Sequence, residues 1–592
     1  MGYCQCTISL VLFFSLTVSN ERSNMDTFEL LDSCKQTETG PVVPTNKMVT
    51  FLENVQSAAL KTYGNKGFDP KLYVDMSLKF DLSIIEESFA KLSRMGENSS
   101  IKIPVSELDE FIEKYLDDPE KDLVYIKPVD FVDEPEGFLN NVKNDEMRAF
   151  ALEIHSLWKN LSREVSGRVL ERPDLHTLLP LKNPVMIPGS RFREVYYWDS
   201  YWVIRGLMVS KMYETAKGIV YNLISLIDQF GYVLNGARAY YTNRSQPPLL
   251  SSMVYEIYSR TSDEELVKTT LPALLKEYAF WNSGIHRVTV EDTDGSSHNL
   301  SRYYAMWNKP RPESATIDKE TASKLETPEA KELVYRELAS AAESGWDFSA
   351  RWMRNESDLT TLATTSILPV DLNAFVLKME LDIAFLADVI GETDIAACFT
   401  EASKTRKKAM NSVFWNPDMG QWFDSWFTDK GNSKCEASHQ NQEIFASNFI
   451  PLWIKYFHRD EAKVTKIVES LKTSGLLQPA GIATSLKNTG EQWDFPNGWA
   501  PLQHMIVEGL VRSKSEEARA LAKDIAIRWI RTNYAGYKKT GAMHEKYDVE
   551  KCGNSGGGGE YVPQTGFGWS NGVVLAFLEE FGWPEDLKVG CD

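Results

Sequence analysis

The chain has 592 residues, of which 43% are hydrophobic and 11% aromatic, so it can build a sizeable core and is not disordered throughout. Its formal net charge of −19 at pH 7 opposes a phosphate backbone, and no basic stripe compensates for it, so nucleic acid is not an expected partner. A chain of this length could form several domains or one large one.

The first segment, residues 1–19, is predicted to be a secretory signal peptide. An apolar run from Ile8 to Leu16 is followed by Thr17 and Ser19, which fit the −3 and −1 positions of a cleavage site. The run is far shorter than the ~20 residues that span a bilayer, and the C-terminus PEDLKVGCD lacks an apolar tail. We therefore expect a secreted, soluble product without a membrane anchor.

Asn-x-Ser sequons and cysteines agree with an extracellular protein. Each sequon is a weak signal by itself, but several of them together with a hydrophobic leader favour secretion. The candidate glycosylation sites are Asn98, Asn160, Asn299 and Asn355. The mature chain would keep Cys34, Cys398, Cys435, Cys552 and Cys591. Their number is odd, so at least one is outside any intramolecular disulfide, and the sequence leaves the pairing open.

The remaining chain is predicted to be helical. Residues 20–183 carry no motif, and we expect them to form helices that pack on a main domain at 184–592. Within 464–471 apolar residues recur at i, i+3, i+4 and i+7, which indicates a half-exposed helix, and 515–530 repeats the pattern. Residues 371–392 are instead apolar nearly all round, as in an enclosed helix. These two populations predict a large all-α fold with inner helices ringed by outer ones.

The loops between these helices combine aromatic and charged residues. Six of them read PGSRFREVYYWDSYW, NRSQPP, KPRPES, SGWDFSARW, QWDFPNGWAP and HEKYD. Aromatic rings stack on the C–H faces of a sugar, while Arg, Asp and Glu bind its hydroxyl groups. One such loop could simply pack at a helix end, but six together indicate a sugar-binding pocket.

Four consecutive glycines, Gly556 to Gly559, precede Glu560 and Tyr561 near the C-terminus. A phosphate loop would place a cation where Glu560 stands, and a slack linker would not normally run into aromatic residues such as Trp569. Glycine has no side chain to keep a ligand away from the backbone. We therefore predict that this segment is a pocket wall that approaches a ligand closely.

Five carboxylates in these loops are candidates for acid–base chemistry, and glycosidic cleavage needs two. They are Asp199, Asp347, Asp494, Glu545 and Glu560. For any one of them a helix cap or an Arg partner is the alternative role, and the sequence does not give the separation of a pair. No His-x-x-x-His or paired-Cys pattern occurs in the mature chain, so we expect no metal site.

Three motifs resemble those of the trehalase family. Residues 188–201 match its first signature, Pro-Gly-Gly-Arg-Phe-x-Glu-x-Tyr-x-Trp-Asp-x-Tyr, with Ser190 in place of the second Gly. Residues 492–501 meet the second signature, Gln-Trp-Asp-x-Pro-x-Gly-Trp-x-Pro, in full, and the GGGGEY block is a third hallmark. Family members split α,α-trehalose into two glucose molecules. The resemblance thus implies a glycoside hydrolase that acts on trehalose without a cofactor, a metal or an obligate protein partner.

The resemblance also implies a fold and a mechanism. The family fold is an (α/α)6 barrel, which agrees with the two helix populations, and its mechanism is inverting. The family's general acid corresponds to Asp347 in SGWDFS, and its general base to Glu545 in HEKYD. Asp347 should then have a raised pKa and Glu545 should stay ionised. Inversion further predicts that the two carboxyl groups lie about 6.5–9.5 Å apart, with room for a water molecule.

Substrate-binding positions carry over from the same motifs. They are Arg191, Trp198, Asp199, Asn235, Arg244, Ser245, Gln246, Arg311, Glu313, Gly345 and Glu560. Guanidinium groups donate several hydrogen bonds in a fixed geometry, which suits a neutral disaccharide. Asn243 is a fifth sequon inside this set, and we expect it to be unmodified because a glycan would obstruct the pocket. A leader with sequons resembles the soluble animal and insect members.

Two alternatives stand beside the trehalase interpretation. Another (α/α)6 α-glucosidase is disfavoured by the intact second signature. A catalytically inactive sugar-binding homologue is disfavoured because both Asp347 and Glu545 are present.

Overall fold

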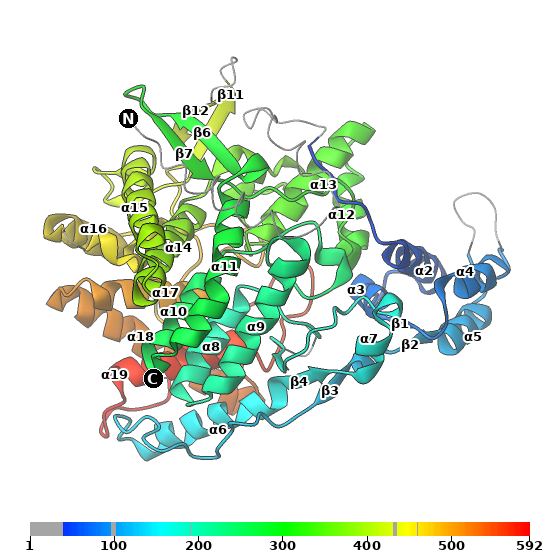
Figure 1. Ribbon diagram of the computed structural model, residues 1–592, viewed down its shortest axis with the longest axis horizontal. Helices are drawn as coiled ribbons and strands as arrows, with labels where there is room; N and C mark the ends of the chain where they lie inside the picture. The colour runs from blue at the N-terminus through cyan, green and yellow to red at the C-terminus, as the bar shows by residue number, and fades with distance from the viewer. Residues whose placement is uncertain (1–39, 96–101, 190, 430–434, 459, 592) are drawn as a thin grey trace.

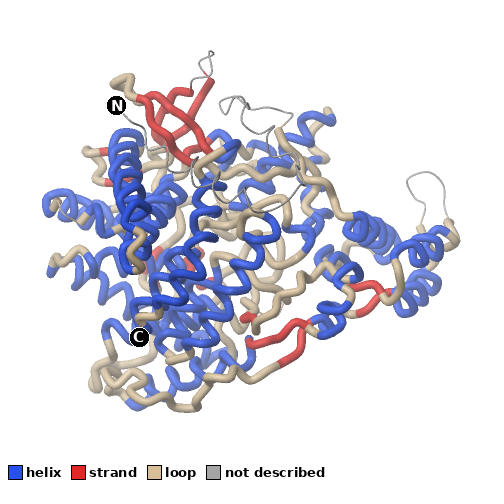
Figure 2. The backbone as a smooth tube through the Cα atoms, in the orientation of Figure 1, coloured by secondary structure: helices blue, strands red, loops and turns tan. Residues whose placement is uncertain are grey.

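The computed structural model describes residues 40–95, 102–189, 191–429, 435–458 and 460–591 (Figure 1). The predicted leader, Cys34 and the candidate glycosylation site Asn98 lie outside these ranges. Helices make up most of the described chain, and the strands form small separate sheets (Figure 2). Within the described ranges, no helix is both long and apolar enough to cross a membrane.

Six helices of the described chain form a closed inner ring. In chain order they are α8 (Asp199–Val209), α10 (Leu250–Thr261), α14 (Val370–Val389), the 3-10 helix η11 (Ala446–Trp453), α17 (Ala500–Arg512) and α19 (Gly568–Phe581). Each contacts the next in this order, and α19 packs extensively against α8, so the ring closes. The enclosed position explains why α14 buries polar as well as apolar positions, including Asn373 and Glu380.

A second layer of helices surrounds this ring (Figure 1). It comprises α6 (Asp145–Leu161), α9 (Tyr213–Phe230), α11 (Glu264–Trp281), α15 (Thr393–Val413), α16 (Glu461–Thr473) and α18 (Glu516–Thr540). Helix α15 packs on α14, α18 on α17 and α19, and α6 on α19. Helix α16 buries one face only, around Val464, Ile467 and Leu471. The prediction of an all-α (α/α)6 barrel with two helix populations is therefore confirmed.

The N-terminal part adds helices outside the barrel. They are α2 (Lys47–Tyr63), α3 (Pro70–Asp75), α4 (Leu82–Ala90), α5 (Val105–Tyr115) and α7 (Gly167–Glu171), and α2, α4 and α5 extend to the right in Figure 1. Helix α3 packs against η7 (Pro312–Ser314). The Gln56 amide reinforces this contact by donating to the Pro312 carbonyl at 2.8 Å. The N-terminal segment thus touches the loops that carry the site, ahead of α12 (Ala315–Ala322) and α13 (Pro328–Glu343).

The strands are short. They are β1 (Ser77–Leu78), β2 (Leu116–Asp117), β3 (Leu123–Tyr125), β4 (Ser162–Val165), β5 (Val185–Met186), β6 (Arg287–Glu291), β7 (Ser297–Ser301), β8 (Ile367–Leu368), β9 (Trp415–Asn416), β10 (Gln421–Trp422), β11 (Ser425–Asp429), β12 (Cys435–Gln440), β13 (Leu477–Gln478), β14 (Gly481–Ile482), β15 (Asn497–Trp499) and β16 (Lys546–Asp548). The largest sheet has the order β7-β6-β12-β11-β8, in which only β6 and β12 run parallel. Strand β15 pairs with β16 and joins the QWDFPNGW segment to the HEKYD segment.

Further short 3-10 helices occur in the connections. They are η3 (Pro119–Asp122), η4 (Pro173–Leu175), η5 (Ala239–Tyr241), η6 (Gly284–His286), η8 (Ala350–Trp352), η9 (Leu359–Thr361), η10 (Thr364–Ser366) and η12 (Lys455–Phe457). A disulfide joins Cys552 to Cys591 across a Cα–Cα distance of 6.0 Å, which resolves part of the pairing that the sequence left open.

Candidate active site

The predicted site residues gather at one end of the barrel. Successive inner helices alternate with outer ones and therefore run in the same direction, so their N-termini meet at that end. Arg191 and Trp198 precede α8, Arg244 precedes α10, and Glu545 and Glu560 precede α19. Loops that are far apart in the sequence are thereby brought to one end of the barrel.

Asp347 lies in the loop between α13 and η8, and its carboxylate faces the Arg311 guanidinium at 3.8 Å. Its side chain keeps 29% of its surface exposed, so a substrate can reach it. Burial raises the pKa of Asp347 to about 7 and Glu560 adds to this, while Arg311 opposes the shift. The Gln492 amide holds the loop by donating to the Asp347 carbonyl at 2.5 Å.

Glu545 is almost fully buried, just before β16. The Tyr561 hydroxyl donates to its Oε1 at 2.7 Å, and the backbone N–H of Gln564 donates to its Oε2 at 3.2 Å. Burial raises the pKa of Glu545, whereas Lys546 and the two hydrogen bonds favour the ionised form. Both oxygens of Glu545 are thus held in place by neighbours.

Asp199 is a third buried carboxyl group, at the start of α8. Burial raises its pKa to about 8, and the charges of Glu545 and Asp347 raise it further. The charges of both predicted catalytic groups therefore act on Asp199. At neutral pH it would be protonated and could donate a hydrogen bond to a sugar hydroxyl.

Arg311 is the centre of an ion-pair network. Its guanidinium makes two hydrogen bonds to Asp318, at 3.0 and 2.6 Å, and one to Glu560 at 2.7 Å. The other oxygen of Glu560 accepts from the Ser314 hydroxyl at 3.0 Å. These contacts fix Arg311 and Glu560 beside Asp347, and they leave Arg311 few free donors.

A second pair, Arg244 and Glu313, is buried next to this network. The Arg244 guanidinium donates to Glu313 at 2.5 Å and to the Asn243 side-chain oxygen at 3.1 Å. Asn243 is itself buried and donates to the Tyr240 carbonyl at 3.2 Å. In contrast, the candidate glycosylation sites Asn160, Asn299 and Asn355 are exposed.

Arg191 is paired from outside the barrel. Its guanidinium donates to Asp69, the N-cap of α3, at 2.9 and 2.8 Å. It also lies over the Tyr561 ring, 4.9 Å from the centroid, and its backbone N–H donates to the Gln564 side chain at 3.0 Å. The N-terminal segment thus contributes a positioning contact that sequence reasoning missed.

Buried tryptophan rings pack the loops of the site against one another. Trp346 stacks on Trp493 at 5.3 Å, and Trp493 stacks on Trp499 at 4.0 Å. Trp198 meets Trp493 at 5.7 Å. Gly345 has φ +75°, and a Cβ there would lie 2.7 Å from the Trp198 ring. Glycine is therefore required where the loop before Asp347 crosses Trp198.

The other predicted polar residues hold loops together. Gln246 accepts from the Trp198 backbone N–H at 3.1 Å. Ser245 donates to the Val233 carbonyl at 2.6 Å, and Asn235 donates to the Ser245 carbonyl at 3.1 Å. All three side chains are buried, so their internal bonds shape the pocket around Trp198.

Asp494, one of the five candidate carboxylates, is fully buried and accepts hydrogen bonds from four groups. The donors are the hydroxyls of Ser349 (2.9 Å), Ser485 (2.8 Å) and Thr489 (2.6 Å) and the backbone N–H of Ala350 (2.8 Å). Asp494 therefore acts as a structural clamp on the loop that carries Asp347. This role is neither of the two alternatives considered for each carboxylate, a helix cap or an Arg partner, because its donors are three hydroxyls and one backbone N–H.

Three of the four glycines, Gly556, Gly558 and Gly559, pack closely against protein. A Cβ at Gly558 would lie 2.3 Å from the Gly490 carbonyl oxygen, and one at Gly559 would lie 2.9 Å from Gln492. The Gly557 N–H also donates to the Asn497 side chain at 3.0 Å. The segment thus packs against residues 490–497, which include the start of the second signature. That it also approaches a ligand stays a prediction.

Tyr561 and Asp318 are further residues that the sequence analysis did not single out. Tyr561 directly follows Glu560 in the GGGGEY block, so its position was a usable signal. Asp318 lies seven residues after Arg311, on α12.

In the described part of the chain, no group of three or more His, Cys, Asp or Glu side chains is arranged to hold a metal ion.

The closed helical ring, with carboxyl and guanidinium groups gathered at one end, agrees with a glycoside hydrolase of the (α/α)6-barrel type. A model of the trehalase family matches residues 65–582. The chain therefore belongs to the trehalase family of glycoside hydrolases.

Individual relatives agree with this assignment. The chain is 58% identical to trehalase of Arabidopsis thaliana over 94% of this chain and 90% of the relative. It is 38% identical to trehalase of Homo sapiens (87% and 86%) and 38% identical to trehalase of Tenebrio molitor (87% and 91%). Neutral trehalase Nth1 from Saccharomyces cerevisiae shares the fold, with a TM-score of 0.54 and 24% identity over 67% of this chain and 73% of that one.

Proposed function

We propose that the protein hydrolyses α,α-trehalose to two glucose molecules by an inverting mechanism, with Asp347 as general acid and Glu545 as general base. The observation that carries the proposal is the contrast between these two groups at one end of the barrel. Asp347 has a pKa of about 7 and a partly exposed carboxyl group. Glu545 is buried and accepts hydrogen bonds on both oxygens. One group is suited to give a proton and the other to take one.

The acid step uses the proton of Asp347. With a pKa of about 7, Asp347 keeps its proton in much of the population near neutral pH. It donates this proton to the glycosidic oxygen as the bond to the anomeric carbon breaks, and the first glucose leaves. Arg311, 3.8 Å away, stabilises the carboxylate that forms.

The base step uses Glu545. Its carboxylate takes a proton from a water molecule, whose oxygen attacks the anomeric carbon from the face opposite the leaving group. Tyr561 and Gln564 hold the carboxylate, and Lys546 favours its ionised form. The attacked sugar changes from α to β, so one α-glucose and one β-glucose are released.

The substrate contacts are proposed for the residues that the motifs singled out. They are Arg191, Trp198, Asp199, Asn235, Arg244, Ser245, Gln246, Arg311, Glu313, Gly345 and Glu560. Asp199, protonated at neutral pH, would donate to a hydroxyl that an ionised carboxylate could only accept from.

We also propose that the protein is secreted after removal of residues 1–19 and is glycosylated at exposed sequons. The exposure of Asn160, Asn299 and Asn355 and the burial of Asn243 support this assignment. The division into a helical segment at 20–183 and a catalytic barrel at 184–592 is likewise a proposal, in which α6 of the first segment packs on α19 and contributes to the outer layer of the barrel. The contact of α3 with η7 supports an N-terminal segment that packs on the barrel.

The test is glucose release from trehalose by the wild type and by two variants, Asp347→Asn and Glu545→Gln. Each variant should lose activity by about 10²–10⁴-fold, the usual contribution of an acid or base. Asp418→Asn is the control, because this carboxylate is exposed in the turn between β9 and β10. A folded wild type that releases no glucose would favour the sugar-binding alternative, and full activity in either variant would refute its role.

A further inference from the structure

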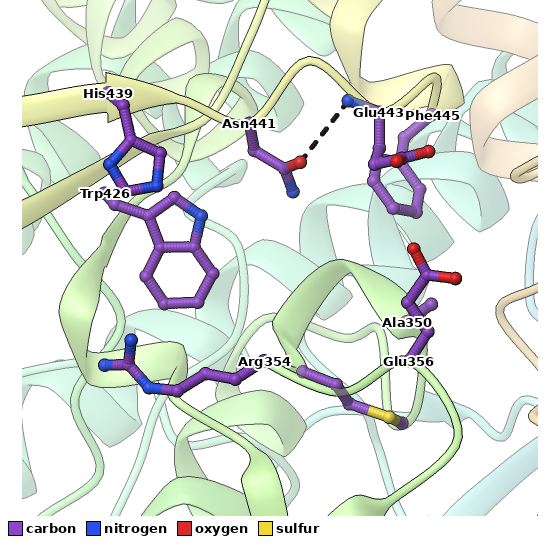
Figure 3. A pocket seen from close by; sticks show the side chains of 9 residues that line it. Ala350, Arg354, Glu356, Trp426, His439, Asn441, Glu443 and Phe445 are labelled. Atoms are coloured by element: carbon purple, nitrogen blue, oxygen red, sulfur yellow. Dashed lines mark hydrogen bonds between the residues drawn. The ribbon is translucent and has the colours of Figure 1, made fainter.

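A pocket separate from the proposed active site opens beside the five-stranded sheet (Figure 3). It has a volume of about 340 Å³, within the range of about 300–1,000 Å³ that is usual for small-molecule sites. Its lining residues are Ala350, Met353, Arg354, Glu356, Trp426, His439, Asn441, Glu443 and Phe445. None of the catalytic or substrate-binding residues named above is among them.

One side of this pocket is aromatic and basic. Trp426 of β11 and His439 of β12 stack with an interplanar angle of 18° and a centroid distance of 6.3 Å. The Arg354 guanidinium lies 4.9 Å from the centre of the Trp426 ring. The Trp426 ring borders the open space in Figure 3.

The opposite side is made of carboxylates and an amide. Lys487 pairs with both Glu356, at 2.9 Å, and Glu443, at 3.2 Å, and holds the two acids together. The Asn441 side-chain oxygen accepts from the Glu443 backbone N–H at 3.3 Å. In Figure 3 the Asn441 side chain and the Glu356 carboxylate both point toward the middle of the pocket.

The charges around the pocket nearly cancel. Arg354 and Lys487 balance Glu356 and Glu443, so the lining favours neither a phosphate nor a cation. An aromatic wall that faces carboxylate, amide and guanidinium groups suits a molecule with an apolar face and many hydroxyl groups. A pyranose ring has this chemistry, and the pocket is large enough for one.

We infer that this pocket is a second binding site for a neutral hexose, distinct from the catalytic centre. The ligand packs beside Trp426, while Arg354, Glu356 and Asn441 bind its hydroxyl groups. The choice of glucose as the probe rests on the proposed function, since glucose would be the product at the neighbouring site.

The pocket shares a loop with the proposed acid. Ala350 lines the pocket and donates its backbone N–H to Asp494, the clamp described above, at 2.8 Å. Asp347 lies three residues earlier in the same loop. A sugar in the pocket therefore contacts the far side of the loop that carries Asp347.

The test is a glucose titration of the full-length protein labelled with 5-fluorotryptophan and followed by fluorine NMR. Trp426→Phe removes one of the 16 tryptophan signals and thereby assigns Trp426. Trp198→Phe assigns a reporter in the proposed active site. Trp583→Phe assigns a buried reference whose indole N–H is bonded to the Leu587 carbonyl near the C-terminus. Each site is then read separately in the same titration.

We expect the Trp426 signal to shift in a saturable way with glucose and to stay fixed with mannitol, which has the hydroxyl groups but no ring face. Arg354→Ala should weaken the Trp426 response roughly fivefold, the effect of losing one hydrogen bond of about 1 kcal/mol. Arg519→Ala is the matched control, because this Arg also lies over an aromatic ring, that of Phe581, at 5.7 Å. It should leave the titration unchanged.

Two results would overturn the inference. One is a Trp426 signal that does not move at glucose concentrations that shift Trp198. The other is an Arg354→Ala variant that is folded by circular dichroism and yet shows the same Trp426 response as the wild type. Glu356→Gln makes the same check on the opposite side of the pocket. Failure of the proposed function would give different results: the Trp198 signal would not shift with glucose, and the protein would not hydrolyse trehalose.

Discussion

Gly345→Ala tests how the loop before Asp347 is held. Gly345 has φ +75°, a conformation that costs a residue with a side chain about 1–2 kcal/mol. The new Cβ would also lie 2.7 and 2.8 Å from two atoms of the Trp198 ring. Trp198 has little room to move, because Trp202 (5.3 Å), Trp493 (5.7 Å) and Trp569 (6.0 Å) surround it. Overpacking of this kind costs about 1–3 kcal/mol in addition.

Gly391→Ala separates the two costs. Gly391 has φ +81°, but a Cβ there would meet no atom within 4 Å. It should therefore lose only the backbone contribution of about 1–2 kcal/mol. The free energy of unfolding of Gly345→Ala should be lower than that of Gly391→Ala by about 1–3 kcal/mol.

Activity provides the second readout. Because Gly345 lies two residues before Asp347, displacement of the loop should misplace the acid. A shift of about 1 Å can cost on the order of 10²-fold in kcat, so Gly345→Ala should be nearly inactive and Gly391→Ala close to wild type. Denaturant titration followed by tryptophan fluorescence and a trehalose hydrolysis assay measure the two effects. Equal stability losses in both variants, with wild-type kcat in Gly345→Ala, would refute the reasoning.

Three further predictions concern the carboxyl groups. Since general acid catalysis needs protonated Asp347, kcat/KM should fall as pH rises through about 7. If kcat/KM fell only near pH 8, the titrating group would instead be Asp199. Tyr561→Phe removes a hydrogen bond that lowers the pKa of Glu545, so the acid limb of the same profile should move to higher pH; an unchanged limb would contradict the role of Tyr561. Asp494→Ala leaves four buried donors without their acceptor and should lower the free energy of unfolding by about 3 kcal/mol or more. Asp494→Asn should lower the free energy of unfolding by less. A denaturant midpoint equal to wild type in Asp494→Ala would show that the clamp is dispensable.

Much of the architecture could be predicted from local patterns. The enclosed helix α14 and the one-sided helix α16 differ in apolar periodicity, which is a property of neighbouring residues. The candidate carboxylates were found because they lie in aromatic, charged loops. The closure of α19 onto α8 could not be read in this way, since it joins segments more than 350 positions apart.

Long-range partners account for most of what the sequence did not reveal. Asp69 pairs with Arg191 across 122 positions and lies in a segment without motifs. The clamp role of Asp494 depends on Ser349 and Ala350, about 145 positions away. The five-stranded sheet likewise combines strands from 287 to 440, and its register follows from tertiary packing.

Proton NMR of the glucose anomers at early times of trehalose hydrolysis tests the central claim most directly. Inversion with Asp347 as acid and Glu545 as base predicts equal amounts of α- and β-glucose from the wild type before mutarotation. Asp347→Asn and Glu545→Gln should both show almost no glucose signal in the same spectra. If only α-glucose appeared first, the reaction would proceed with retention, and the proposed roles of the two carboxyl groups would be wrong.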